Sequence, residues 1–335
     1  MNNSCQEQEK DYELPEPPTD SVSALEFVPK TSTWNALCAG SWDNSVRIWE
    51  VQSNQVVPKV MKVLGGIPLD ISWHHSGTKV FVGDSNGAVV DWDLESNQII
   101  KIGAHQGATR TCHWADQFLM TTSWDKTLIF WDLRTPGTIV KRFLPGRSYA
   151  ADILDPVAIV ASSDGCISAY ALDDGGVEKV RMKSAGNKTA QARSLAINKS
   201  KDTGNISWFL AKSNGVVYEQ SSANRIGTLV IRSNRWEPEN GVLNVHTLHD
   251  IKINREKNQM ATAGSDGVFS IYECNTFKLM KSKKLDQPIT KCSYSGDGEL
   301  FAYALGYDWS KGHEYFDPNK KPQILLRPFE KDVRP

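Results

Sequence analysis

Side chains that could recognise a partner are more prominent in this chain than side chains that could catalyse a reaction. The sequence has 11 Trp among 335 residues, and Trp combines a large apolar surface with an N–H that needs a partner. There is no nucleophile elbow, no phosphate-binding loop and no HExxH zinc motif. Asp152 and Asp155 lie close together, but two nearby carboxylates are common on any protein surface. The residues therefore favour binding over catalysis.

Metal and disulfide chemistry is not indicated either. The cysteines form no CxxC pair, and no His lies at metal-ligand spacing from them. We expect them to be small buried apolar residues in a reducing compartment, and we expect no metal and no cofactor. The six cysteines are Cys5, Cys38, Cys112, Cys166, Cys274 and Cys292.

Acidic residues are concentrated at the N-terminus. Residues 1–26 contain seven acids and one base, which leaves 32 acids and 37 bases in the rest of the chain. A mildly basic body attracts phosphate, but an excess this small fits a solvated surface better than a nucleic-acid site. The polar start is unlike a signal peptide, and no apolar run approaches the roughly 18 residues of a membrane span. We therefore expect a cytosolic or nuclear protein with no membrane span.

A turn motif recurs along the chain and predicts the elements that position these side chains. In its clearest copies, Ser-Trp-Asp at residues 41–43 leads to Trp49, and Ser-Trp-Asp at residues 123–125 leads to Trp131. The turn residues at 43, 86, 125, 164, 214, 266 and 308 are 39 to 52 residues apart. A period of about 40–45 residues with this signature is that of a WD40 blade of four strands. We predict an all-β, seven-bladed WD40 β-propeller, with insertions at 174–190 and 222–243 explaining the two longest steps.

Domain boundaries follow from where the repeats begin and end. We expect an acidic N-terminal segment at residues 1–20, a propeller at 21–327 and a C-terminal tail at 328–335. An open ring would leave unpaired strand edges. We therefore expect a strand at about 11–14, before the Pro-rich break at 15–18, to form the outer strand of the last blade and close the ring.

One repeat carries a set of polar residues that could be mistaken for a catalytic relay. His105, Thr121, Asp125 and Trp131 occupy the positions at which WD40 blades link a loop His, a strand Thr, a turn Asp and a strand Trp. Burying such groups is tolerable only when they satisfy one another. We therefore interpret them as a structural brace rather than as catalytic residues.

Exposed tryptophans are predicted on one face of the disc. The variable residue of the Ser-x-Asp turn is Trp42 in the first repeat and Trp124 in the third, and Trp309 lies next to the equivalent Asp of the last. These repeats are near neighbours around a ring, so an arc of Trp favours a protein-binding surface. The alternative is that each Trp folds back over its own blade. Arg147 and Arg193 precede the first strands of two blades, where they are either partners for carboxylates or solvated loop residues.

The last repeat resembles a particular family. Residues 302–314 read Ala-Tyr-Ala-Leu-Gly-Tyr-Asp-Trp-Ser-Lys-Gly-His-Glu, which is similar to the last blade of the mRNA export factor family. These nuclear-pore WD40 proteins are also called Gle-two, or ribonucleic acid export factor one. Residues 40–52, 123–128, 264–267 and 285–289 also match, and the resemblance extends from about Asp11 to Arg327. Departures at 83–87 and 213–216 mark this chain as a divergent member.

The resemblance implies a non-enzymatic platform. Members of the family dock a short acidic segment, the Gle-two-binding sequence, of an FG nucleoporin and take part in mRNA export through the nuclear pore. The resemblance also implies contact with single-stranded RNA or mRNP and links to spindle assembly. It places the protein in the nucleus and at the nuclear envelope, with cytoplasmic shuttling. We expect the protein to be monomeric alone.

The same resemblance implies which residues bind. Trp42, Trp124, Arg147 and Arg193 match positions on or near the family's docking face. The exposed last-blade loop, which the family uses for partner and nucleic-acid contacts, corresponds to Tyr307, Asp308, Trp309, Lys311 and His313. In physical terms, an indole offers a flat face for stacking and an ammonium offers a phosphate contact.

Three other functions stay open on the sequence. A spindle-checkpoint propeller would bind the same kind of segment on checkpoint kinases, although it shares the run at 307–314 only in looser form. A generic scaffold, such as a ubiquitin-ligase substrate receptor, would give no special role to Trp309. A propeller enzyme is supported by no motif, although propellers do host enzymes.

Overall fold

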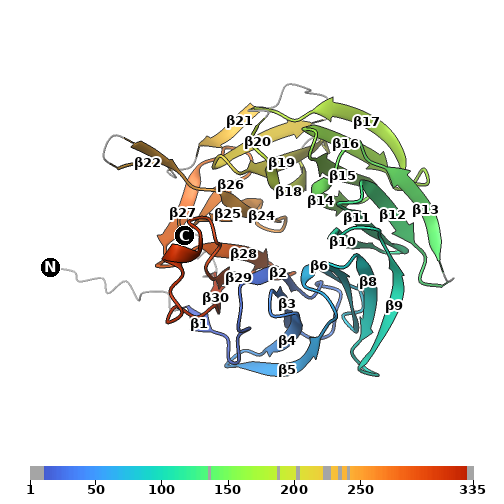
Figure 1. The fold of residues 1–335 in the computed structure, drawn as a ribbon, viewed down its shortest axis with the longest axis horizontal. Coiled ribbons are helices and arrows are strands. Elements are labelled where there is room, and N and C mark those ends of the chain that lie inside the picture. The colour runs from blue at the N-terminus through green and yellow to red at the C-terminus, as the bar shows by residue number, and fades with distance from the viewer. Residues whose placement is uncertain are drawn as a thin grey trace, which may run out of the picture.

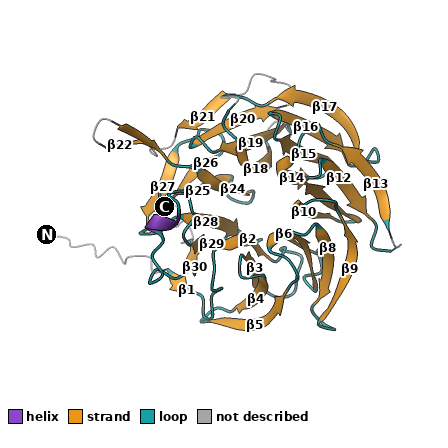
Figure 2. Ribbon diagram, viewed as in Figure 1, coloured by secondary structure: helices purple, strands orange, loops and turns teal. Residues whose placement is uncertain are grey.

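Seven four-stranded antiparallel sheets are arranged radially around a central axis (Figures 1 and 2). This computed structural model describes residues 11–134, 137–186, 189–200, 204–221, 228–232, 236–239 and 242–329. Within these ranges the only helical element is the short 3-10 turn η1 (His313–Tyr315). The architecture is the predicted seven-bladed β-propeller, and we number its blades 1 to 7 in chain order.

Each of the first four blades is one continuous stretch of chain. Its first strand lies nearest the central axis, and each following strand lies farther out. Blade 1 contains β2 (Val22–Phe27), β3 (Ala36–Ser41), β4 (Ser45–Val51) and β5 (Val56–Val63). Blade 2 contains β6 (Pro68–Trp73), β7 (Lys79–Asp84), β8 (Ala88–Asp93) and β9 (Gln98–Ala104). Blade 3 contains β10 (Thr109–Ala115), β11 (Phe118–Ser123), β12 (Thr127–Trp131) and β13 (Thr138–Phe143). Blade 4 contains β14 (Ser148–Leu154), β15 (Val157–Ser162), β16 (Cys166–Ala171) and β17 (Val177–Lys183).

The remaining blades complete the ring. Blade 5 contains β18 (Ala192–Lys199), β19 (Ile206–Lys212), β20 (Val216–Ser221) and β21 (Thr228–Arg232). Blade 6 contains β24 (Leu248–Asn254), β25 (Gln259–Gly264), β26 (Val268–Glu273) and β27 (Leu279–Lys284). Blade 7 contains β28 (Ile289–Tyr294), β29 (Leu300–Leu305), β30 (Gln323–Pro328) and, as its outermost strand, β1 (Tyr12–Glu13).

Burial explains why the strands have different compositions. The second strand of a blade is covered on both faces by neighbouring blades, so β3 reads Ala-Leu-Cys-Ala-Gly-Ser and every residue is buried. The outermost strand faces solvent on one side, so β17 alternates exposed and partly buried residues. The tight turn between the second and third strands needs a residue with positive φ. Asn44 and Lys126 occupy that position in blades 1 and 3, both with φ of 66°.

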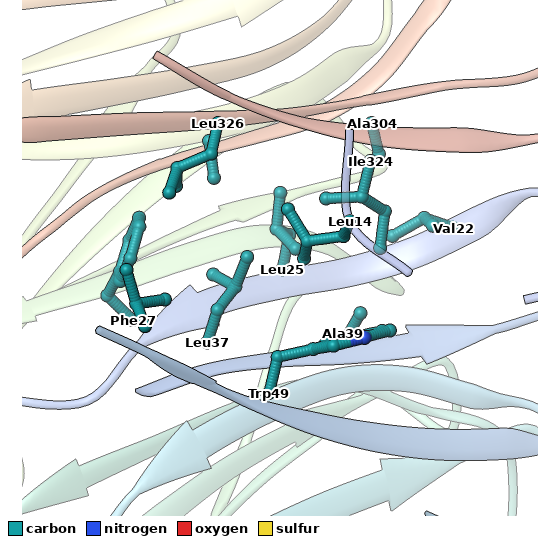
Figure 3. Close-up of a cluster of buried hydrophobic side chains, with 12 residues drawn as sticks. Leu14, Val22, Leu25, Phe27, Leu37, Ala39, Trp49, Ala304, Ile324 and Leu326 are labelled. Carbon is teal, nitrogen blue, oxygen red and sulfur yellow. The ribbon is translucent and has the colours of Figure 1, made fainter. Parts of the chain in front are cut away.

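The hydrophobic core lies between blades rather than inside any one of them. One cluster joins blade 7 to blade 1 and contains Leu25, Leu37, Trp49 and Ile324, together with Leu14 from beyond β1 (Figure 3). The indole Nε1 of Trp49 donates a hydrogen bond to the carbonyl of Pro15 at 2.7 Å. Each blade therefore depends on its neighbour for a buried face, which requires the ring to close.

The N-terminal strand closes the ring. Tyr12 pairs with Leu326 and Glu13 with Leu325, in the position expected from the sequence. The side chain of Asp11 extends this pairing, because its carboxylate accepts hydrogen bonds from Arg327 at 2.6 Å and Tyr303 at 2.7 Å. It also contacts Lys283 of β27. We call these four side chains the Asp11 clasp; it ties the N-terminus to both of the last two blades.

Three carboxylates on the innermost strands join adjacent blades. Asp70 of blade 2 accepts a hydrogen bond from the backbone N–H of Cys112 in blade 3, at 2.9 Å. Asp152 of blade 4 does the same for Ile197 of blade 5 at 2.8 Å, as does Asp250 of blade 6 for Cys292 of blade 7 at 3.1 Å. We call these three residues the inner aspartates.

Of the two expected insertions, the structure shows an added element only in the second. Residues 174–190 contain β17, the ordinary fourth strand of blade 4. Residues 222–243 contain β21 and most of a hairpin outside the seven sheets, β22 (Trp236–Glu239) with β23 (Val242–Val245), and β22 projects from the rim in Figure 1.

The expected boundary at 327 is too early. Pro328 pairs with Leu300, and the ring of Phe329 stacks on that of Tyr294. Residues 1–10 and 330–335 of the two expected end segments lie outside the described residues. Across the described ranges, no helix has the length and hydropathy that crossing a membrane requires.

Candidate partner-binding face

Three tryptophans are about half exposed at one face of the disc. Trp42 lies in the β3–β4 turn, Trp124 in the β11–β12 turn and Trp309 in the β29–β30 loop. Their exposed fractions are 52%, 43% and 53%. The backbone N–H groups of Trp42 and Trp124 donate to Ser21 and Ala108, in the connections that enter their own blades. Turns and entry connections therefore share this face, which we call the turn face.

A buried aspartate holds the turn beneath Trp42. Asp43 accepts hydrogen bonds from the N–H groups of Thr19 and Ser45, each at 2.9 Å, and from both hydroxyls. Burial alone would raise the pKa of Asp43, but these hydrogen bonds outweigh it and hold that pKa below its ordinary value. The carboxylate belongs to the turn, and the indole next to it faces solvent.

The four residues grouped in blade 3 form one hydrogen-bonded chain. The Nε2 atom of His105 lies 2.8 Å from the Oγ1 of Thr121, which also accepts a bond from Trp131 Nε1 at 2.8 Å. The Nδ1 atom of His105 lies 3.3 Å from Asp125 and 2.8 Å from Thr127, a member that the sequence analysis missed. Burial lowers the pKa of His105 despite the opposing charge of Asp125. These groups satisfy one another and brace the Trp124 turn.

Asp308 has a different position from the one expected of it. Its side chain is 3% exposed, and its Oδ2 lies 2.7 Å from the Nε2 of His249 in blade 6. The hydroxyl of Ser265, also in blade 6, donates to the same oxygen, and Ser310 donates to Oδ1. Burial would raise the pKa of Asp308, but the bonds from His249, Ser265 and Ser310 outweigh it and hold that pKa far below its ordinary value. A positioning role therefore replaces the direct partner contact expected for Asp308.

Trp309 sits at the centre of an aromatic platform. Its ring is parallel to that of Phe316, with centroids 5.3 Å apart and 9° between the planes, and Tyr307 approaches it edge-on at 5.3 Å. The backbone of Trp309 has φ of 58°, which is uncommon outside Gly. The hydroxyl of Tyr307 donates to the carbonyl of Gly312 at 2.5 Å and closes the loop.

Positive side chains surround this platform. Lys311 is exposed, and its Nζ lies 5.8 Å from the ring centroid of Tyr315. His313 is exposed at the start of η1. A groove of about 510 Å³ beside Trp309 is lined by Pro17, Phe316, Lys320 and Lys321, among others. The groove residues were not predicted, because residues 17 and 320 meet only when the ring closes.

The structure places the two arginines differently. The backbone of Arg147 is hydrogen-bonded to Ser163 in the blade 4 turn, so its exposed side chain lies at the turn face. Arg193 does not precede its blade, as expected, but lies inside β18 at an irregularity between Ala192 and Ser194. It is exposed and lines a cavity on the propeller axis. Arg193 therefore belongs to the inner edge of the turn face.

Two exposed apolar side chains extend the turn face outward. Val63 ends β5 opposite Ser45, and Phe143 ends β13 opposite Thr127, so each lies beside a Trp-bearing turn. They are 65% and 77% exposed. The sequence analysis missed both, because exposed apolar residues on an outer strand have no distinctive spacing. No group of three or more His, Cys, Asp or Glu within the described ranges could hold a metal ion.

Comparison with known proteins agrees with this architecture. The family model for the WD domain, G-beta repeat, matches residues 10–50 and 96–132. The solved "Structure of U3-55K" superposes with a TM-score of 0.79 over 95% of this chain and 98% of its own, at 15% identity. "Crystal structure of RRP9 WD40 repeats" gives 0.77 over 95% and 97%, at 14% identity. These likenesses show the fold alone: the protein is a WD40 β-propeller.

Curated relatives define the family more closely. "Protein Rae1" of Drosophila melanogaster is 40% identical over 97% of this chain and 96% of its own length. "mRNA export factor" of Danio rerio is 39% identical and that of Xenopus tropicalis 37%, each over 97% of this chain and 91% of its own. The chain belongs to the family of WD40 propellers named Rae1 or mRNA export factor.

Proposed function

We propose that this protein takes part in mRNA export as a non-enzymatic platform that docks an acidic segment of an FG nucleoporin and contacts RNA. The export role is supported by the names of relatives that align over nearly its whole length. The observation that carries the platform is the set of three half-exposed tryptophans on the turn face. Such indoles are costly to leave in water unless a partner covers them.

The turn face suits an acidic segment with apolar anchors. Trp42 and Trp124 each present an indole from a turn that a partly buried Asp fixes, and Trp is a common anchor residue in protein interfaces. Arg147 and Arg193 are exposed on the same face, and a guanidinium can bind a carboxylate through two parallel hydrogen bonds. A peptide crossing this face would meet aromatic anchors and cations in turn.

The Trp309 platform suits single-stranded RNA. Stacking on an aromatic side chain contributes about 1–3 kcal/mol per base and tolerates any sequence. Lys311 supplies a cation for the backbone phosphates, whose binding depends on salt because counterions are released. We also propose that the protein is a monomer when alone. In the cell it would reside in the nucleus and at the nuclear pore and shuttle to the cytoplasm.

Calorimetry with the acidic segment of the same organism's FG nucleoporin tests the docking. We expect Arg147→Glu and Arg193→Glu to weaken binding by about tenfold or more, since each reverses a charge worth about 1.5–3 kcal/mol in a charge-assisted bond. Lys199→Glu is the matched control, because Lys199 is exposed at the opposite end of β18 from Arg193. No binding by the parent protein would reject the nucleoporin and direct the same measurement to checkpoint-kinase segments.

Filter binding of single-stranded RNA at two salt concentrations tests the second contact. We expect Trp309→Ala with Lys311→Ala to weaken RNA binding and to reduce its salt dependence, with the fold intact. Trp124→Ala with Lys126→Ala is the matched control, because it removes a Trp and a Lys at the same spacing from another turn. Equal affinity in the 309/311 variant and the parent would remove this loop from the RNA site.

A further inference from the structure

A polar cavity of about 350 Å³ lies on the propeller axis, where the innermost strands face one another. It is lined by the inner aspartates, by Glu26 and by more cations than acids. The five cationic residues are Arg110, Arg193, Lys252, Arg255 and Lys291. The platform and the turn-face tryptophans do not line it, so the inference below does not rest on the proposed function.

The acids of this cavity are largely committed to the protein. Each inner aspartate accepts a backbone N–H from the next blade. Asp250 also accepts a bond from Ser194 at 2.8 Å and lies 3.9 Å from the Nζ of Lys291. Asp152 lies 3.8 Å from Arg255.

Two of the cations lack comparable partners. The ammonium of Lys252 is attracted by Asp250, Glu26, Asp70 and Asp152 through charge alone, and no hydrogen bond to it occurs within the described residues. The guanidinium of Arg110 makes one long bond, of 3.4 Å, to the carbonyl of Arg193. Arg110, Lys252 and Lys291 are close enough to influence one another electrostatically. A cluster of sheltered cations with unused donors is unfavourable unless something negative joins it.

Glu26 does not fill that role. Its carboxyl group interacts with Lys252 through charge only, and burial raises its pKa to about 8. Burial therefore weakens the negative charge that Glu26 contributes to the cavity. The Nε2 atom of His113, which also lines the cavity, is buried without a hydrogen-bond partner in the described part of the chain.

We propose that the axial cavity binds a small oxyanion of the phosphate class between Arg110, Lys252 and Lys291. A tetrahedral dianion presents several acceptor oxygens, which matches the unused donors of a guanidinium and two ammonium groups. It would also balance the excess of cationic over acidic residues in the cavity lining. The cavity is large enough for phosphate and a few waters but too small for a folded partner. Free phosphate and a phosphate monoester share this chemistry.

Titration of the full-length protein with inorganic phosphate, followed by 31P NMR and calorimetry at constant ionic strength, tests the proposal. We expect saturable 1:1 binding to the parent and at least tenfold weaker binding to Lys252→Met. Lys199→Met, an exposed control at the far end of β18, should bind like the parent. A parallel titration with adenosine monophosphate distinguishes the two possible ligands. If the protein binds adenosine monophosphate as well as inorganic phosphate, the site accepts phosphate monoesters. If it binds inorganic phosphate alone, the site is for the free ion.

Thermal unfolding supplies an independent measurement. Phosphate should raise the melting temperature of the parent above that in chloride of equal ionic strength, because a ligand of the native state stabilises it. If Lys252→Met does not fold, Arg110→Gln takes its place in both experiments. Absence of saturable binding by the parent, or equal binding by the parent and the cation variant, would show that the cavity holds only water and overturn the proposal.

Discussion

Blade 3 and blade 7 both present a Trp beside an Asp that a His contacts, but they are built in different ways. Blade 3 is one continuous stretch from β10 to β13, and its brace of His105, Thr121, Asp125, Thr127 and Trp131 belongs to its own repeat. Blade 7 is assembled from both ends of the chain. Its Asp308 is held by two residues of blade 6, and its outer strand is fixed by the Asp11 clasp.

The two hydrogen-bond networks therefore contribute differently to the stability of the protein and to the position of the loop that carries the Trp. A brace whose members are close together in the sequence, as His105 in the connection from β9 is to β11 and β12, forms with its own repeat and contributes mainly to stability. A brace that crosses from one blade to the next also sets the position of the loop it holds. We therefore expect damage to blade 3 to unfold the protein, and damage around Asp308 to disturb the Trp309 platform first. The predictions below start with the largest effect on stability.

Removal of the closing strand should have the largest effect. Deleting residues 1–15 removes the β1–β30 pairing, the Asp11 clasp and the buried Leu14. It also leaves Arg327 and Tyr303 without the carboxylate they contact. We expect a loss of about 4 kcal/mol or more, measured by urea denaturation and calorimetry. Deletion of residues 1–10, which stops before Asp11, is the control and should behave like the parent. An unchanged melting temperature in the longer deletion would show that the ring does not need this strand.

Removal of the Thr121 hydroxyl, which both His105 and Trp131 contact, should have the second-largest effect on stability. Thr121→Val keeps the shape but leaves His105 and Trp131 buried without their partner, which should cost about 2–4 kcal/mol. Chemical denaturation measures the loss, and RNA affinity at the distant Trp309 platform should not change while the protein is folded. Thr290→Val is the control, since its hydroxyl makes a single bond of 3.4 Å. A change in RNA affinity would contradict the separation of the two blades.

Asp308→Ala should have a smaller effect on stability and a larger one on binding. We expect a loss of about 1–3 kcal/mol and clearly weaker RNA binding, because the platform loses its anchor. The pKa of Asp308 is depressed in the folded state, so its contribution is fully present above the ordinary carboxyl range and is lost as pH falls toward the depressed value. The melting temperatures of parent and variant should therefore differ by a constant amount above pH ~5 and converge in stronger acid. A difference that grew in acid would contradict this assignment.

His249→Ala should be the mildest change. Ser265 still holds the same carboxylate oxygen, so we expect a loss of about 1 kcal/mol and a few-fold weaker RNA binding. His105→Ala is the informative comparison, because it should cost more stability and leave RNA affinity unchanged. If the two histidine variants behaved alike in both measurements, the proposed contrast between the blades would be wrong.

The sequence alone predicts the features that recur at a regular spacing along the chain. Seven turns at a nearly regular spacing predict seven blades, and the offsets among His105, Thr121, Asp125 and Trp131 predict the blade 3 brace. The ring-closing strand was expected because an open propeller leaves unpaired edges. Each of these arguments uses residues within one repeat or a requirement of the whole ring.

Features that depend on contacts between distant residues were not predictable in this way. His249 lies 59 positions before Asp308 and in another blade, so no motif joins them, and Asp308 was taken for a contact residue. Phe316 stacks on Trp309 across a loop whose path has no sequence signature. Arg193 was placed before its strand, whereas it is the second residue of β18. The axial cavity joins single residues from separate repeats.

The pairing of β1 with β30 also has a consequence for biosynthesis. Tyr12 leaves the ribosome 314 residues before its partner Leu326. At about 5–20 residues per second, the closing strand waits roughly 15–60 seconds for the strand it pairs with. During that time the nascent chain exposes the flanks of incomplete blades. Protection of these hydrophobic edges would therefore matter most just before β30 emerges, when six blades are present and the seventh is not yet closed.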